Sequence, residues 1–185
     1  PRRPQLYLSH FGLTQPQIEA FETCASFGCR KRTQLAYSAS EWHSLAAIFE
    51  PPAASPAEER QRLLIAIAAM ETLVGAKNGT AGDLPKNQRR SSNSAQLDCI
   101  AEAANTTVAL LLLEQNGLMR HHRVGYPRHR GIAQGCFPHN SAAIVERESG
   151  EAFAVDAWFF ANGKPPVCVP MDSWKAGYAP SSPDD

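Results

Sequence analysis

The chain has 185 residues, of which 43% are hydrophobic and 19% are charged, and its 18 Lys and Arg balance its 18 Asp and Glu. This composition is typical of a folded globular domain and excludes a disordered chain. The longest apolar runs, residues 63–70 and 108–113, are far shorter than the roughly 18 residues of a membrane-spanning helix. A formal net charge of zero also argues against a nucleic-acid binder that depends on bulk electrostatics.

Two features of the chain bear on its cellular location. It begins Pro1-Arg2-Arg3-Pro4 without a Met, so we expect the numbering to start inside a longer precursor or an engineered form of the protein. A precursor would favour an exported or periplasmic protein whose signal has been removed. It has an odd number of cysteines, so at least one stays unpaired within the chain. Cys24 and Cys29 are close enough in sequence to form a local disulfide in an oxidising compartment, or they simply pack as thiols.

The first part of the chain is predicted to be helical. Residues 14–27 place Ile18 and Phe21 near helical spacing and predict a first helix, and residues 40–49 predict a second one with an apolar face. Together these helices predict an N-terminal helical extension over residues 1–54.

The clearest helix start in the chain is at Ser55. Ser55 is predicted to be the N-cap, Pro56 occupies the first helical position, and Glu58 can reach back to complete a capping box. The apolar spacing continues to Gly75, which is expected to end the helix. Residues 77–95 fit no period, which indicates a functional or mobile loop, or alternatively a disordered linker.

The second part of the chain changes from helix to strand. Residues 98–116 predict a helix that is apolar on every side in its second half, which is typical of a core helix. Residues 141–147 and 152–160 predict two strands joined by a hairpin turn at residues 148–151, and residues 118–126 are a weaker strand candidate. This order of elements predicts the α+β class, with the antiparallel sheet late in the chain.

Cys99 lies at the start of the predicted core helix, directly after the long loop. The positive end of the helix dipole stabilises a thiolate, so this position is expected to lower the pKa of the thiol. The free N–H groups of a helix start can also bind the oxyanion that forms when a thiolate attacks a carbonyl. Cys99 is therefore a candidate nucleophile, although a lone cysteine at the base of a buried helix is more often a small apolar residue.

His139 and Asp156 are placed to serve such a nucleophile. They are separated by 156 − 139 = 17 residues that span one predicted hairpin, so their side chains can lie on neighbouring strands at one end of the sheet. A carboxylate there can fix the imidazole tautomer, and the imidazole can then deprotonate the thiol of Cys99. Asp156 lies in an apolar run, where an unpaired carboxylate is costly and a partner is expected.

The chain resembles a known family at these residues. Asp98-Cys99 at the head of a helix, His139 at a strand start and Asp156 one hairpin later resemble the Cys-His-Asp arrangement of the transglutaminase-like superfamily. More narrowly, the chain is similar to the bacterial transglutaminase-like cysteine proteinases, which share the papain-like core. The resemblance covers residues 55–160.

The resemblance implies both a fold and a division of the chain. It implies an α+β fold whose papain-like or transglutaminase-like core packs a central helix on an antiparallel sheet. We expect this catalytic core over residues 55–175, after the helical extension over residues 1–54 and before a C-terminal tail over residues 176–185.

The resemblance also implies an activity. Cys99 would be the nucleophile, His139 the general base and then acid, and Asp156 the residue that orients His139. The expected function is hydrolysis of an amide bond in a protein or peptide substrate through an acyl-enzyme, with no cofactor, no metal and no nucleic-acid partner. Transglutaminase or deamidase activity with the same triad stays open, and Asn93 or Gln96 could supply the side-chain donor to the oxyanion.

A second group of residues supports other hypotheses. The sequence over residues 120–130 is rich in Arg and His, which is compatible with a nucleic-acid-binding patch or with recognition of an acidic group on a substrate. Cys136 and His139 form a C-x-x-H pair that could contribute to a zinc site. A non-enzymatic zinc-binding or nucleic-acid-binding module that uses residues 120–139 is therefore the alternative to an enzyme.

Overall fold

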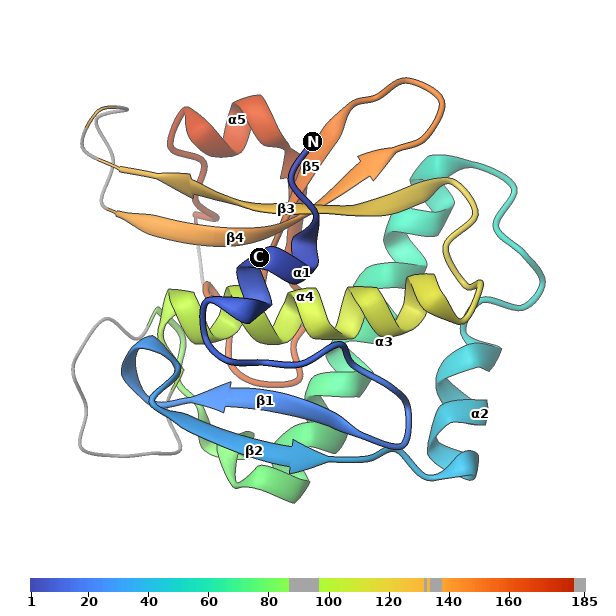
Figure 1. Ribbon diagram of the computed structural model, residues 1–185. Coiled ribbons are helices and arrows are strands. Elements are labelled where there is room, and N and C mark those ends of the chain that lie inside the picture. Colours follow the sequence, from blue (N-terminus) through green and yellow to red (C-terminus); the bar gives the residue numbers. More distant parts are fainter. Residues whose placement is uncertain (87–96, 132, 134–137, 182–185) are drawn as a thin grey trace.

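The protein is described here from a computed structural model that covers residues 1–86, 97–131, 133 and 138–181 (Figure 1). The helices are α1 (Pro4–Ser9), α2 (Ala39–Ala47), α3 (Pro56–Asn78), α4 (Cys99–Gln115) and α5 (Met171–Lys175), with short 3-10 helices η1 (Phe27–Cys29) and η2 (Thr80–Gly82). The strands are β1 (Phe21–Ala25), β2 (Lys31–Leu35), β3 (His122–Arg130), β4 (His139–Glu146), β5 (Ala152–Asp156) and β6 (Val167–Pro170).

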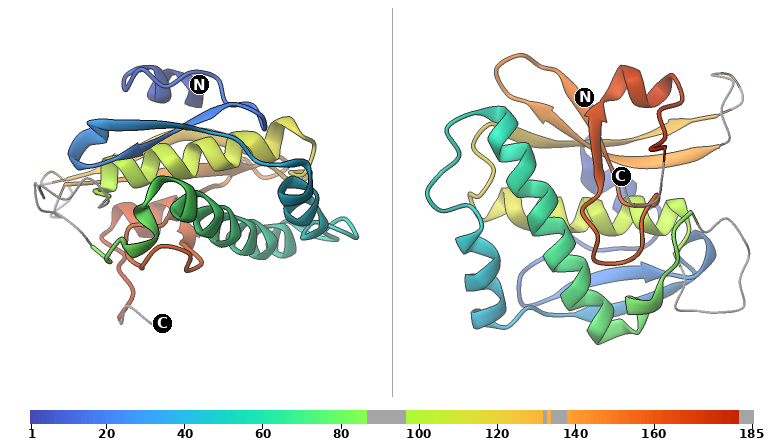
Figure 2. Two further views of the ribbon diagram at one scale, coloured as in Figure 1. Left: turned by 90° about the horizontal axis from the view of Figure 1, so that it is seen from below. Right: turned by 180° about the vertical axis from the view of Figure 1, so that it is seen from behind.

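The strands form two antiparallel sheets on different sides of α4. One sheet pairs β1 with β2, and the other has the order β3-β4-β5-β6. Helix α4 packs against both β1 and β4, and Figures 1 and 2 show it running between the two sheets, with α3 crossing behind it. The α+β class predicted from the sequence is confirmed.

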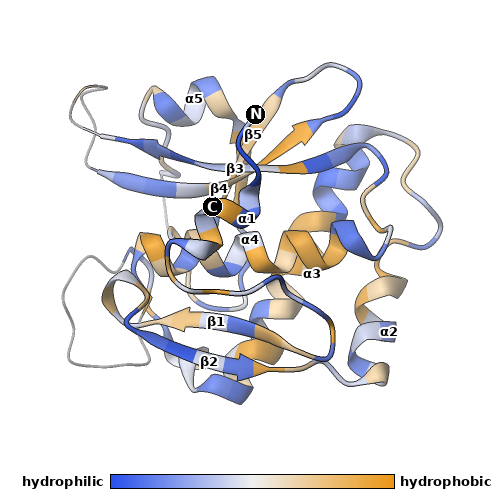
Figure 3. Cartoon of the chain, viewed as in Figure 1, coloured by the Kyte–Doolittle hydropathy of each residue, from blue (hydrophilic) through white to orange (hydrophobic). Residues whose placement is uncertain are grey.

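Helix α4 forms the centre of the core. It begins at Cys99, and the side chain of the N-cap residue Asp98 accepts a hydrogen bond from the backbone N–H of Ala101 at 2.9 Å. Its consecutive residues Leu110–Leu113 are all fully buried, because different faces of the helix are covered by the two sheets and by α3. The hydrophobic colouring along α4 in Figure 3 agrees with the predicted core helix.

Helix α3 begins where the sequence predicts. The hydroxyl of Ser55 accepts a hydrogen bond from the N–H of Glu58, while the Glu58 carboxylate accepts one from the N–H of Ala54. The predicted end at Gly75 is wrong, because the helix continues to Asn78 and ends at Gly79. Gly79 has a φ of 83°, a left-handed conformation that glycine adopts at little cost at a helix C-terminus.

The helix predicted over residues 14–27 is wrong. This segment contains strand β1, which forms an antiparallel pair with β2 through a turn at η1. The side chain of Asn105 on α4 explains the difference, because it accepts a hydrogen bond from the N–H of Cys24 at 2.7 Å and donates one to its carbonyl at 2.8 Å. These bonds satisfy the backbone of an extended strand rather than that of a helix. The second predicted N-terminal helix is confirmed as α2.

The predicted strands of the second half are present with shifted boundaries. The strand predicted over residues 141–147 is β4, and the strand predicted over residues 152–160 is β5, which ends earlier, at Asp156. The weaker candidate over residues 118–126 is β3, which begins later, at His122. Among the helices that the structure describes, none combines the length and the apolar character required to cross a membrane.

Candidate active site

His139 and Asp156 come together at one end of the larger sheet. His139 is the first residue of β4 and Asp156 is the last residue of the neighbouring strand β5. The Nε2 atom of His139 lies 2.6 Å from Oδ2 of Asp156, and both side chains are almost fully buried. The carboxylate accepts a hydrogen bond from the Nε2–H of His139, so Nδ1 is the ring nitrogen left to act as a base.

The carboxylate of Asp156 has further hydrogen-bond donors. The indole Nε1 of Trp174 on α5 donates to Oδ2 at 2.8 Å, and the backbone N–H of Trp158 donates to Oδ1 at 3.2 Å. These bonds offset the cost of burying a charged group and hold its position. The sequence prediction that Asp156 has a partner is confirmed.

Aromatic side chains surround the imidazole of His139. Its ring centroid lies 4.4 Å from that of Trp158, 5.6 Å from that of Phe159 and 5.7 Å from that of Trp174. Cys99 packs against the same hydrophobic cluster, which includes Trp158 and Phe159. These contacts restrict rotation of the imidazole and bring it to the same cluster as the first residue of α4.

The thiol of Cys99 lies next to the start of β4. The backbone N–H of Asn140, the residue after His139, donates towards the Cys99 sulfur. The Nδ1 atom of His139 is buried and makes no hydrogen bond to any of the residues that the structure describes. The structure therefore brings Cys99 close to the His139–Asp156 pair, but without a direct hydrogen bond between the thiol and the imidazole.

The expected lowering of the Cys99 pKa is wrong. Burial raises the pKa of the Cys99 thiol to about 11, and the negative charges of Asp98 and Asp156 act in the same direction. The N–H of Asn140 opposes these effects without outweighing them. The helix start thus does not by itself generate a thiolate here, because desolvation disfavours the charged form of the thiol more than the local N–H groups favour it.

A disulfide lies against the start of α4. Cys24 and Cys29 are disulfide-bonded, which decides between the alternatives that the sequence left open. Within the turn that they close, the N–H of Gly28 donates to Oδ2 of Asp98 at 2.8 Å. The disulfide-closed turn therefore contacts the carboxylate of the residue immediately before Cys99.

Side chains of the Arg- and His-rich stretch over residues 120–130 make hydrogen bonds within the fold. His122 is fully buried, and its Nδ1 lies 2.9 Å from the carboxylate of Glu59. Burial by itself would raise the pKa of Glu59, but His122 and the N–H groups of residues 120 and 121 hold it below its usual range. Arg130 is buried and donates to the carbonyl of Trp174 at 2.6 Å. Several side chains proposed for nucleic-acid binding therefore have structural partners.

Three predicted residues lie outside the described part of the chain, namely Asn93, Gln96 and Cys136. The two candidate oxyanion donors and one member of the C-x-x-H pair therefore have no structural account. Within the ranges that the structure does cover, no group of three or more His, Cys, Asp or Glu residues is arranged to hold a metal ion.

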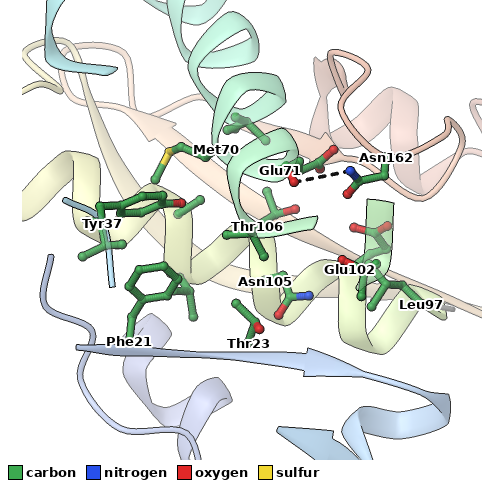
Figure 4. Close-up of a pocket in the computed structure, with 16 residues that line it drawn as sticks. Phe21, Thr23, Tyr37, Met70, Glu71, Leu97, Glu102, Asn105, Thr106 and Asn162 are labelled. Atoms are coloured by element: carbon green, nitrogen blue, oxygen red, sulfur yellow. Dashed lines mark hydrogen bonds between the residues drawn. The ribbon is translucent and has the colours of Figure 1, made fainter. Parts of the chain in front are cut away.

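A further group of buried carboxyls includes Glu102, which lies one turn after Cys99 on α4. Glu71 and Glu102 line a mainly apolar cavity of about 40 Å³ (Figure 4). Asp83 makes a side-chain hydrogen bond to Glu102. Burial raises the pKa of Glu71 to about 8 and that of Asp83 to about 6, and it also raises the pKa of Glu102. This cavity does not include Cys99 or His139 in its lining, so we do not place it in the candidate active site.

Sequence reasoning missed two side chains that the fold brings to this region. Trp174 reaches Asp156 from α5, and Tyr7 reaches the neighbourhood of Cys99 and Asn140 from α1. Both lie far from Cys99 in the chain and carry no local motif. Only a prediction of tertiary contacts could have found them.

The chain has no match in any of the comparisons with known proteins: no protein-family model, curated protein or solved structure is similar to it.

Proposed function

We propose that the protein is a thiol hydrolase that cleaves an amide bond in a protein or peptide through an acyl-enzyme at Cys99. The observation that carries the proposal is the buried pair of His139 and Asp156. The Nε2 atom of His139 is hydrogen-bonded to the carboxylate of Asp156. The Nδ1 atom makes no hydrogen bond to the described residues, and it lies near the start of α4. A base whose tautomer is fixed in this way is what a cysteine nucleophile requires.

In the proposed reaction, His139 activates a neutral thiol. Because burial holds the Cys99 pKa near 11, the thiol is protonated at neutral pH and loses its proton to Nδ1 of His139 as the sulfur attacks the carbonyl carbon. The C–N bond then breaks, and His139 returns the proton to the leaving amine. Water then hydrolyses the resulting thioester, with His139 again acting as the base. Throughout the reaction, Asp156 accepts a hydrogen bond from the Nε2–H of His139.

The arrangement also supports the finer fold relationship that the sequence suggests. A central helix that begins with the candidate nucleophile packs against an antiparallel sheet that carries the histidine and the aspartate. We propose on this basis that residues 55–175 have a papain-like or transglutaminase-like core. Transfer to an amine instead of water, or attack on a side-chain amide, would use the same acyl-enzyme.

Alkylation by iodoacetamide provides a first test with an internal control. Cys168 is also a half-buried free thiol with a pKa raised by burial to about 11, and no contact with His139 is described for it. With His139 as base, Cys99 should be alkylated at neutral pH at least about 10²-fold faster than Cys168. In His139→Ala, the Cys99 rate should fall to that of Cys168 and keep rising towards pH 11.

Peptide mapping by mass spectrometry separates the two cysteines and also Cys136. Equal, slow alkylation of Cys99 and Cys168 in the wild type would refute activation by His139. Hydrolysis is then tested with denatured casein, by the appearance of new amino termini, ammonia release or incorporation of a fluorescent amine. New amino termini identify a peptidase and incorporation of the amine identifies a transglutaminase. Ammonia release without amine incorporation identifies a deamidase, because transamidation of a glutamine also releases ammonia. Each product should be absent in Cys99→Ser.

A further inference from the structure

The hydroxyl of Tyr7 is a buried polar group without a hydrogen bond to any described residue. The ring of Tyr7 is held between neighbouring aromatic rings, with its centroid 5.2 Å from that of Phe11 and 5.9 Å from that of Tyr126. A buried tyrosine hydroxyl normally finds a partner, because leaving it unpaired costs about 1–3 kcal/mol. The described part of the chain therefore offers the Tyr7 O–H no acceptor.

The surroundings of this hydroxyl are those of the candidate active site. Helix α1, which carries Tyr7, packs on α4 and β3 (Figure 1). The Asn140 side chain lies within hydrogen-bonding reach of the Tyr7 oxygen, and Cys99 and Asp98 lie close enough to affect the pKa of Tyr7. Burial raises the pKa of Tyr7, and the nearby Asp98 acts in the same direction, so the hydroxyl stays protonated and remains a donor at neutral pH.

The neighbouring side chain of Asn140 is already engaged. Its Oδ1 lies 2.8 Å from Nδ1 of His129, and the backbone N–H of the same residue is directed towards the Cys99 sulfur. The interaction with Asn140 lowers the pKa of Tyr7, so in it Asn140 acts as the donor and the Tyr7 O–H near Cys99 is left without an acceptor among the described residues. A donor held in place before reaction is what stabilises charge that develops only in the transition state.

We propose that the Tyr7 hydroxyl donates a hydrogen bond to the oxyanion that forms when Cys99 attacks a carbonyl carbon. The inference rests on the function proposed above. As the C–S bond forms, the π electrons of the carbonyl move to its oxygen, and the Tyr7 O–H binds that oxygen. When the intermediate collapses, the C=O bond re-forms and the bond to the leaving group breaks, while Tyr7 keeps its proton.

Two probes of Cys99 separate this role from other roles of Tyr7. Acylation by p-nitrophenyl acetate passes through a tetrahedral oxyanion and releases p-nitrophenolate, whereas alkylation by iodoacetamide displaces iodide at a CH₂ group and forms no oxyanion. In Tyr7→Phe, acylation of Cys99 should slow by roughly 10²-fold, the usual effect of removing one oxyanion donor. Its alkylation rate should stay within about twofold of the wild type.

The stability of Tyr7→Phe gives a further readout. Removing an unpaired buried hydroxyl should leave the midpoint of thermal unfolding unchanged or higher, unlike the loss of a structural hydrogen bond. Tyr37→Phe is the matched control, because Tyr37 is another buried tyrosine and stacks on Phe21 away from Cys99, with a ring-centroid distance of 4.7 Å. It should leave both reaction rates unchanged.

The outcomes distinguish failure of this inference from failure of the proposed function. If wild-type Cys99 reacts with neither probe faster than Cys168, the proposed function fails and the Tyr7 inference falls with it. If wild-type Cys99 reacts fast and Tyr7→Phe slows neither reaction, the inference alone is overturned. Equal slowing of both reactions also overturns it, because Tyr7 would then act on the thiol rather than on the oxyanion.

Discussion

The carboxyl groups of Glu71, Asp83 and Glu102 lie buried together, and we predict that they make the protein less stable as the pH rises from about 4 to about 8. Burial raises the pKa of Glu71 to about 8 and that of Asp83 to about 6. In this pH range, the folded protein holds protons that the unfolded chain releases. The free energy of unfolding therefore falls with rising pH and levels off above the folded-state pKa values.

The expected magnitude follows from these pKa values. One pKa unit corresponds to about 1.4 kcal/mol of unfolding free energy, and the raised pKa of Asp83 contributes a decline in the same direction as that of Glu71. Glu71, raised from about 4.5 to about 8, contributes about 5 kcal/mol. One oxygen of Glu71 accepts a hydrogen bond from the N–H of Gly163 at 3.0 Å, while its Oε1 has no bond to the described residues.

Urea unfolding of wild type and Glu71→Gln at a series of pH values measures this effect. Gln is neutral at every pH, so the difference in unfolding free energy between the two proteins should change by about 3–5 kcal/mol between pH 4 and pH 8, in favour of the variant at high pH. Glu148→Gln, which changes an exposed residue of the hairpin turn, should follow the wild type. Parallel profiles for wild type and Glu71→Gln would refute the assignment of a raised pKa to Glu71.

Three further predictions concern the contacts that hold the fold and the site. Glu59→Ala should lower the free energy of unfolding by about 3–5 kcal/mol, because it leaves the buried His122 and neighbouring N–H groups without their partner. Urea titrations measure this loss, and a value below about 1 kcal/mol would contradict the prediction. Replacing both Cys24 and Cys29 by Ser should lower the free energy of unfolding by about 2 kcal/mol, since the disulfide closes a short loop with a sequence separation of 5. An unchanged urea midpoint would argue against a stabilising role of the disulfide. Trp174→Phe removes the indole donor to Asp156 and should cost about 2 kcal/mol. It should also reduce the ratio of Cys99 to Cys168 alkylation, and a protein that is less stable but keeps this ratio would assign Trp174 a structural role only.

Local chemistry made parts of the fold predictable. Ser55 and Pro56 specify the start of α3 because a capping hydroxyl and a fixed φ angle act within one turn of helix, independently of the rest of the chain. The predicted core helix and the hairpin between β4 and β5 are recovered for similar reasons of period and turn composition. The start of β1 was not predictable in this way, because residues 14–27 also fit a helical period, and Asn105 on a distant helix satisfies the strand backbone.

The sequence by itself singled out Cys99, His139 and Asp156, since their order and spacing suffice to place a histidine and a carboxylate on adjacent strands. Their roles stay predictions, while the hydrogen bond between His139 and Asp156 is present in the structure. Only the tertiary structure decided how strongly the Cys99 thiol is desolvated, and hence the direction of its pKa. Only the tertiary structure also shows that Tyr7 lies near Cys99. Burial and long-range contacts depend on how distant segments pack, and no local window of sequence encodes them.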